Sequence, residues 1–282
     1  MAQGSLGQTV VFGVDGSGAV WVPFTKRQMK DDEMYQEFSS IYEEKIREDF
    51  DYKKMAGFIR QHCQAAGIKP NLVLDMGCGT GNASLELVQD VRQMVLCDPS
   101  SEMLTIARNK FKAPFLPQFI QGMADEIRIP DRFDLILSVL DVPNYLEQDE
   151  FKAYLRNSYG NLKTLGLLIF DVSSVFKLEE MARVGTYIYD EDHYFHVWEN
   201  KLKGQQLEME INLFIKEPPP ANTDLYQRIT EQQTMFLHPR TDIEVWAREI
   251  GFGLIGVYDD YAEILAKPDT QRMVFVFKKE NK

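Results

Sequence analysis

Apolar and polar positions alternate in blocks through the middle of this chain. Five apolar runs between residues 71 and 172 are short enough to be strands, and in order they read NLVLDMG, QMVLCD, PQFIQG, FDLILSVL and GLLIFDV. Helical stretches separate them, at 82–90, 101–110 and 148–165. Because strands that alternate with helices form parallel sheets covered on both faces, this pattern predicts a buried α/β sheet.

Different patterns flank this block. Apolar residues recur at spacings of three and four from Met34 to Ile46, which predicts a helix, and a second helix is expected at 52–66, just before Gly67. Beyond residue 171 the chain has the pattern of antiparallel strands, at 187–189, 194–199, 207–215 and 224–237. A helix near 241–250 and two strand-like runs then complete the sheet.

These changes divide the chain into three parts. Residues 1–33 form a small hairpin or a flexible leader, and both interpretations stay open. Residues 34–172 together with 238–282 form the ligand-binding domain, and 173–237 form a β-rich insertion. The insertion is rich in aromatic residues, namely Tyr187, Tyr189, Tyr194, Phe195 and Trp198. We expect it to cover the carboxyl edge of the sheet as a lid, while a homodimer surface is the competing explanation.

Charge and hydropathy limit the classes of partner. The chain has 282 residues and a net charge of -12, from 31 Lys and Arg against 43 Asp and Glu. A surface of this sign repels polyanions, so nucleic acid is not expected as a substrate. The chain lacks both a run of about 18 apolar residues and the basic start of a secretion signal, so we expect a cytoplasmic protein without a membrane span.

Cysteine and histidine do not predict a metal site. Cys63, Cys78 and Cys97 form an odd, widely spaced set without a CxxC pair, which argues against disulfides and against zinc bound by thiolates. His193 and His196 are three residues apart on a predicted strand, so their side chains would point to opposite faces. Buried free thiols and isolated histidines are the expected outcome.

The strongest candidate for chemistry is the loop in VLDMGCGTGN. Gly77, Gly79 and Gly81 directly follow a predicted buried strand and precede a helix, so the backbone can turn tightly and approach a ligand. The spacing is GxGxG, whereas dinucleotide enzymes have GxGxxG. The negative charge of Asp75 would repel a pyrophosphate but would attract a ligand with an ammonium and a sulfonium group. Alternatively, Asp75 could simply cap the turn. Asp98 ends the next strand, where an acidic residue binds ribose hydroxyls.

With these residues the chain resembles the class I methyltransferases that use S-adenosylmethionine (SAM). Their first motif matches Val73 to Gly81, their D-x-S-x-x-M-L motif matches Asp98 to Leu104, and the fourth strand matches 133–136. The segments 133–146 and 166–181 and the sequence HVWEN are most similar to the bacterial YqeM-like methyltransferases, with small-molecule N-methyltransferases as relatives. The resemblance implies a Rossmann-like, seven-stranded, mostly parallel sheet with an antiparallel β-rich insertion.

The resemblance also implies positions for the cofactor. The methionine portion of SAM would be surrounded by Asp75, Gly77, Cys78, Gly79 and Gly81. The ribose would lie at Asp98 and Pro99, and the adenine would pack on Met103. Relatives often place an acidic residue after the third strand to meet the adenine, but this chain has 121–125 as QGMAD. The acid is therefore either absent or shifted to Asp125, and backbone groups of Met123 and Ala124 are a substitute. Tyr42 resembles a tyrosine that reaches the cofactor carboxylate, and core packing is an equal alternative.

Methyl transfer from SAM needs alignment of the acceptor more than an activated protein nucleophile, so no catalytic triad is expected. Asp141, Asn144 and Tyr145 follow the fourth strand and are the candidates for the acceptor side, where one of them could remove a proton. Alternatively, Asn144 closes a turn after Pro143 and Tyr145 packs. The predicted function is methylation of a small molecule or a protein; a SAM-binding sensor without turnover and a nucleotide-dependent oxidoreductase are the alternatives.

Overall fold

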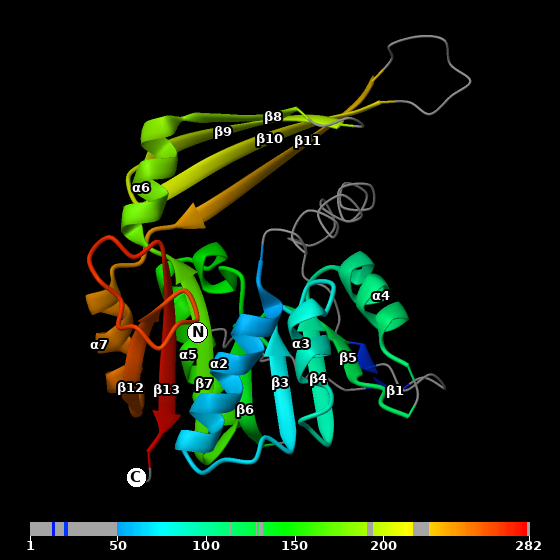
Figure 1. Ribbon diagram of the computed structural model, residues 1–282, viewed down its shortest axis with the longest axis vertical. Helices are drawn as coiled ribbons and strands as arrows, with labels where there is room; N and C mark the ends of the chain where they lie inside the picture. Colours follow the sequence, from blue (N-terminus) through cyan, green and yellow to red (C-terminus); the bar gives the residue numbers. More distant parts are fainter. Residues whose placement is uncertain are drawn as a thin grey trace, which may run out of the picture.

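The computed structural model describes residues 13–14, 20–21, 50–112, 114–127, 129, 132–190, 194–216 and 226–280. In that part, a large sheet with helices on both faces lies beneath a smaller antiparallel sheet (Figure 1). The helix expected from Met34 to Ile46 lies outside the described residues. No helix among the described residues is long and apolar enough to cross a membrane.

The main sheet has the strand order β1-β2-β5-β4-β3-β6-β7-β13-β12. The parallel strands are β3 (Leu72–Met76), β4 (Gln93–Asp98), β5 (Gln118–Gln121), β6 (Phe133–Ser138) and β7 (Leu162–Ser173). Strands β13 (Arg272–Lys279) and β12 (Phe252–Asp259) add in antiparallel fashion beyond β7. At the other edge, the two-residue strands β1 (Gly13–Val14) and β2 (Val20–Trp21) pair with each other, and Val20 pairs with Ile120. Strands β5 to β12 in this order form the expected seven-stranded, mostly parallel, Rossmann-like sheet.

Side chains alternate between two hydrophobic layers, as expected for a sheet buried on both faces. Val73 packs on the face covered by α2 (Tyr52–Ala65), α3 (Asn82–Leu87) and α4 (Ser101–Lys110). Its neighbour Leu74 packs on the face covered by α5 (Gln148–Asn161) and α7 (Arg240–Ile250). The predicted helices therefore form as expected, although α5 ends at Asn161, so the residues up to 165 begin β7 instead.

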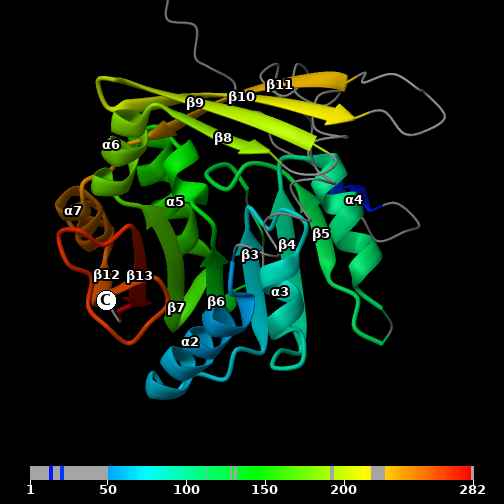
Figure 2. The same cartoon turned by 45° about the horizontal axis from the view of Figure 1, so that its top comes forward.

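The insertion is a separate four-stranded antiparallel sheet of order β11-β10-β9-β8. Its strands are β8 (Thr186–Asp190), β9 (Tyr194–Lys203), β10 (Gln206–Lys216) and β11 (Tyr226–Phe236). Figures 1 and 2 show this sheet above the carboxyl ends of the parallel strands of the main sheet. One of its faces packs on the helix α6 (Val175–Val184) through Leu178, Leu207, Met209, Met235 and Leu237.

The strand pattern of the insertion did not predict α6. Its N-cap is Ser174, whose hydroxyl accepts a hydrogen bond from the Lys177 amide. Only Leu178 is fully buried in this helix, so its apolar stripe is too narrow to stand out from the flanking strands. The serine followed by Val175, Leu178 and Met181 at helical spacing was the available signal.

Candidate active site

The glycine loop between β3 and α3 is fixed to the neighbouring strand by its backbone. The amides of Gly77 and Cys78 both donate to the Cys97 carbonyl, at 2.8 and 2.9 Å. The three glycines have φ angles of +73°, +53° and +79°, a conformation that side-chain-bearing residues rarely adopt. The loop therefore needs glycine at these positions before any ligand is considered.

The surroundings of the three glycines differ. A Cβ on Gly77 would lie 2.6 Å from a methyl of Val142, and one on Gly81 would lie 3.1 Å from Ala107. In the part of the chain that the structure describes, no atom would lie within 4 Å of a Cβ on Gly79. Gly77 and Gly81 are thus required by internal packing, whereas Gly79 leaves its open side to a ligand that approaches the backbone.

Asp75, at the end of β3, is fully buried. One carboxylate oxygen accepts a 2.6 Å hydrogen bond from the Ser84 hydroxyl, and the other, Oδ1, has no hydrogen-bond partner among the described residues. Burial raises the pKa of Asp75 to about 6, and the hydrogen bond from Ser84 opposes that rise. A buried anion with an unused acceptor fits a ligand that brings an ammonium group.

Asp98, at the end of β4, connects the glycine loop to α4. Its carboxylate accepts hydrogen bonds from the amides of Gly79 at 2.8 Å and Ser100 at 2.9 Å. Burial raises the pKa of Asp98 to about 6, while these two amides lower it. Because a carboxylate oxygen can accept more than one hydrogen bond, each oxygen keeps acceptor capacity for a ribose hydroxyl.

The residues expected around the adenine lie beside Asp98. Met103 is 7% exposed in the first turn of α4, and the Pro99 carbonyl accepts a hydrogen bond from Gln121, at the end of β5. The carbonyls of Met123 and Ala124 already accept hydrogen bonds, from the Glu126 and Ile127 amides and from the Asn157 side chain. These hydrogen bonds fix the segment after β5, in which the Met123 and Ala124 backbone groups are the candidates for contact with the adenine.

The acceptor-side candidates lie on or beside the short 3-10 helix η2 (Val142–Tyr145), which contacts the glycine loop through Val142. Asn144 is fully buried, and its side chain donates to the carbonyls of Ser173 and Phe236 and accepts from the Ser173 amide. These hydrogen bonds use both N–H donors of the Asn144 side chain. They favour the alternative in which Asn144 closes the turn after Pro143. Tyr145 is 43% exposed, and its hydroxyl donates to the Gln233 side chain at 3.1 Å.

Asp141 belongs to an ionic cluster that the sequence did not reveal. Its carboxylate lies 3.3 Å from the Arg272 guanidinium, which also lies 3.1 Å from the buried Asp171. Asp171 in turn accepts hydrogen bonds from the amides of Leu140 and Asp141 and from the Tyr261 hydroxyl. Leu140 and Asp141 have φ angles of 63° and 65°, so Asp171 stabilises an unfavourable turn that places η2 against the glycine loop.

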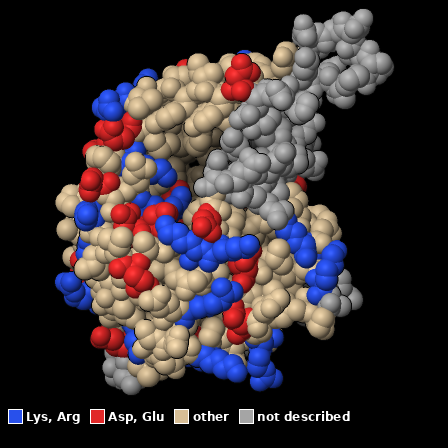
Figure 3. Space-filling model, in the orientation of Figure 1, with Lys and Arg blue, Asp and Glu red and all other residues tan. Residues whose placement is uncertain are grey.

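The remaining predictions concern a tyrosine, the histidines, the cysteines and the charge of the surface. Tyr42 and His193 fall outside the described residues. Among the described residues no group of three His, Cys, Asp or Glu side chains could hold a metal ion. Cys63, Cys78 and Cys97 are buried and free, and burial raises the pKa of each thiol. On the described part of the face in Figure 3, basic side chains are mixed with acidic ones and form no uniform basic surface.

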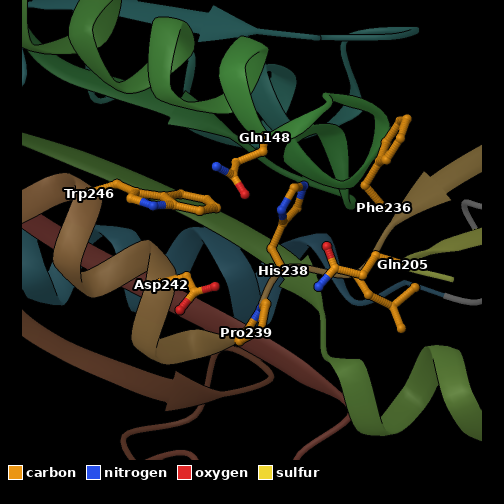
Figure 4. Close-up of a pocket in the computed structure, with 8 residues that line it drawn as sticks. Gln148, Gln205, Phe236, His238, Pro239, Asp242 and Trp246 are labelled. Atoms are coloured by element: carbon orange, nitrogen blue, oxygen red, sulfur yellow. The ribbon is translucent and has the colours of Figure 1, made fainter.

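A small cavity lies between α5, α7 and the end of β11, and none of the predicted site residues lines it. Figure 4 shows its lining, with the His238 ring near Gln148. The His238 Nε2 is 2.9 Å from the Leu146 carbonyl, and burial lowers the pKa of the ring. Neutral His238 therefore bonds the backbone and packs between Phe151 and Trp246, which is a structural role.

Comparison with known proteins agrees with this geometry. The profile of a family described as a methyltransferase domain matches residues 73–166. The Bacillus subtilis protein YqeM, provisionally described as a methyltransferase, is 26% identical over 86% of this chain and 96% of its own length. The SAM-bound CalS10 of Micromonospora echinaspora has a TM-score of 0.65 at 15% identity, over 85% of this chain and 96% of that chain, which is a likeness of fold.

A closer relative with a solved structure is a SAM-dependent methyltransferase from Clostridium acetobutylicum. It is 30% identical, its TM-score is 0.79, and the match covers 88% of this chain and 99% of that chain. The chain therefore belongs to the SAM-dependent methyltransferases.

Proposed function

We propose that this chain transfers the methyl group of SAM to a small-molecule acceptor held between the glycine loop, η2 and the insertion sheet. The observation that supports this proposal is the buried Asp75, whose Oδ1 has no hydrogen-bond partner in the described part of the chain, four residues before the glycine with an open side, Gly79. In this assignment Asp75 binds the cofactor ammonium, Asp98 binds the ribose hydroxyls, and Met103 packs on the adenine. The cofactor supplies an electrophilic methyl group on a positively charged sulfur.

The protein positions the acceptor and encloses it. Strand β11 is tied to η2 by the hydrogen bonds of Asn144 to Phe236 and of Tyr145 to Gln233. These bonds fix the insertion sheet over the carboxyl edge, where the acceptor must meet the cofactor, and such enclosure favours a small acceptor over a folded protein. CalS10, which shares the fold, is described as an amino pentose methyltransferase, and its acceptor is a small molecule.

The test combines binding and turnover. Isothermal titration should give saturable binding of SAM and S-adenosylhomocysteine (SAH) and none of NADH. Incubation with SAM and a bacterial metabolite extract from which proteins have been removed should release SAH. Binding of NADH would support an oxidoreductase, binding of SAM without SAH release would support a sensor, and SAH release only with the protein fraction would overturn the small-molecule acceptor.

A further inference from the structure

Asp171, near the end of β7, is a buried carboxylate that receives two donors on each oxygen. Its Oδ1 accepts a hydrogen bond from the Asp141 amide at 2.7 Å and lies 3.1 Å from the Arg272 guanidinium. Its Oδ2 accepts hydrogen bonds from the Leu140 amide at 3.0 Å and from the Tyr261 hydroxyl. An amide side chain, which has one oxygen instead of two, could not accept from all four donors. This position therefore requires a carboxylate.

Two of the four donors belong to a turn that is unfavourable by itself. Leu140 and Asp141 both have left-handed backbone, which residues with a Cβ avoid, and Asp171 stabilises this conformation by binding both amides. The turn leads directly into η2, and Val142 at the start of η2 lies against Gly77 in the glycine loop. The carboxylate of Asp171 thus fixes where η2 lies relative to that loop.

Arg272, at the start of β13, holds the same turn through its side chain. Its Nη1 lies 3.3 Å from the Asp141 carboxylate and 3.1 Å from Asp171. The Arg272 side chain is only 15% exposed, so solvent screens these ion pairs weakly. Lys177 of α6 donates to the Ser173 hydroxyl on β7 and lies 3.9 Å from Asp141. Strands β7 and β13 and helix α6 therefore all hold the turn before η2.

The residues assigned to the cofactor have their contacts on other elements. Asp75 accepts a hydrogen bond from α3, and Asp98 accepts hydrogen bonds from the glycine loop and from the N-cap of α4. These elements lie on the β3 and β4 side of the sheet, whereas the Asp171 cluster lies on the β7 and β13 side. A change in the cluster should therefore displace η2 and leave the cofactor residues in place.

Resting on the proposed function, we propose that Asp171 and Arg272 are positioning residues for methyl transfer, which hold η2 so that the acceptor meets the methyl group of SAM in line. Neither residue needs to touch the reacting atoms. Displacement at the methyl carbon depends on alignment of the acceptor atom, the carbon and the sulfur, and a small misplacement lowers the rate steeply. Loss of either residue should therefore lower the maximal rate much more than the affinity for SAM.

The experiment compares the wild-type protein with Asp171→Asn, Arg272→Met and Arg272→Lys, and with a matched control, Asp260→Asn. Asp260 is exposed and lies 3.6 Å from the Nε of the same guanidinium, whereas Asp141 and Asp171 meet its Nη1. Rates of SAH release are measured over a range of SAM concentrations with the protein-free metabolite extract, at a temperature where circular dichroism shows every protein folded. Isothermal titration gives the SAM affinity without turnover. Hydrogen exchange, followed by mass spectrometry, reports on the 139–146 segment, which contains both amides bound by Asp171.

We expect the maximal rate to fall at least tenfold in Asp171→Asn and Arg272→Met, less in Arg272→Lys, which keeps the charge, and less than twofold in Asp260→Asn. SAM affinity should stay within about threefold of wild type in every variant. Exchange should accelerate at least tenfold in the 139–146 segment of Asp171→Asn, while the β3 and β4 segments exchange as in wild type.

A rate within twofold of wild type in Asp171→Asn, or a loss of SAM affinity as large as the loss of rate, would overturn the assignment. Both outcomes leave the proposed function intact, whereas a wild-type protein that releases no SAH refutes the proposed function and this inference with it. If Asp171→Asn does not fold, the two Arg272 variants decide, because equal rates in Arg272→Met and wild type overturn the inference.

Discussion

Alanine substitutions in the glycine loop should separate internal packing from ligand access. All three glycines have positive φ, so alanine at any of them costs about 1–2 kcal/mol of backbone strain. At Gly77 the new methyl would also lie 2.6 Å from Val142, and overpacking of this kind adds about 1–3 kcal/mol. We therefore expect Gly77→Ala to lower the free energy of unfolding by about 2–5 kcal/mol, against about 1–2 kcal/mol for Gly79→Ala.

The affinity for SAM should follow the opposite order from stability, with the more stable variant binding SAM more weakly. Gly79→Ala places its methyl on the open side of the loop, so SAM affinity should fall at least tenfold although the protein is the more stable of the two variants. Urea unfolding gives the stabilities, and isothermal titration at a temperature where both variants are folded gives the affinities. The double variant Gly77→Ala with Val142→Ala serves as the control, because removal of the valine methyls should recover the overpacking part.

Two results would refute this reasoning. If Gly77→Ala is as stable as Gly79→Ala, then Val142 does not press on the loop as the structure indicates. If Gly79→Ala binds SAM like the wild type, the open side of Gly79 does not face the cofactor, and the site assignment is wrong.

Four further predictions concern the neighbouring groups. Asp98→Ala should weaken SAM binding by about 1–3 kcal/mol, measured by titration, and Asp98→Asn should lose less because it keeps one acceptor oxygen. Burial raises the pKa values of Asp75 and Asp98 to about 6, above their unfolded values near 4, so their contribution to the stability of the free protein should fall as pH rises from 4 to 6. SAM affinity should rise over the same pH window. Asp75→Asn should flatten both pH profiles, and SAM affinity independent of pH would contradict the assignment. Asn144→Ala should destabilise the protein by about 1–3 kcal/mol in urea, because the buried Ser173 amide loses its partner, whereas Tyr145→Phe should cost less than about 1 kcal/mol. The three buried thiols should react with iodoacetamide only in denaturant, and rapid labelling of the native protein would contradict their burial.

The cofactor side of the site could be predicted because its residues are local in sequence. Gly77, Gly79 and Gly81 occur within five positions, Asp75 lies two residues before the first of them, and Asp98 ends the following strand. Parallel strands bring their carboxyl ends to one edge, so the pattern of strand, loop and helix already implies where these residues meet. The same regularity predicted the buried parallel sheet and most of its helices, and the resemblance to the methyltransferases implied its seven strands.

The acceptor side could not be predicted in the same way, because it depends on contacts between distant segments. Gln233 is 88 residues from Tyr145, and no spacing in the sequence relates the two; only the packing of the insertion sheet over η2 joins them. Asn144 looked like a candidate for chemistry until the structure showed its amide bonded to two distant backbone segments.

The sequence by itself thus determined the main sheet and the glycine loop that follows β3, since hydrophobic periodicity and glycine spacing are local properties of the chain. Tertiary structure alone decided how the polar groups around η2 are paired. Those groups come from η2 and its N-cap and from β7, β11 and β13, and their burial and pairing exist only once these segments are packed together.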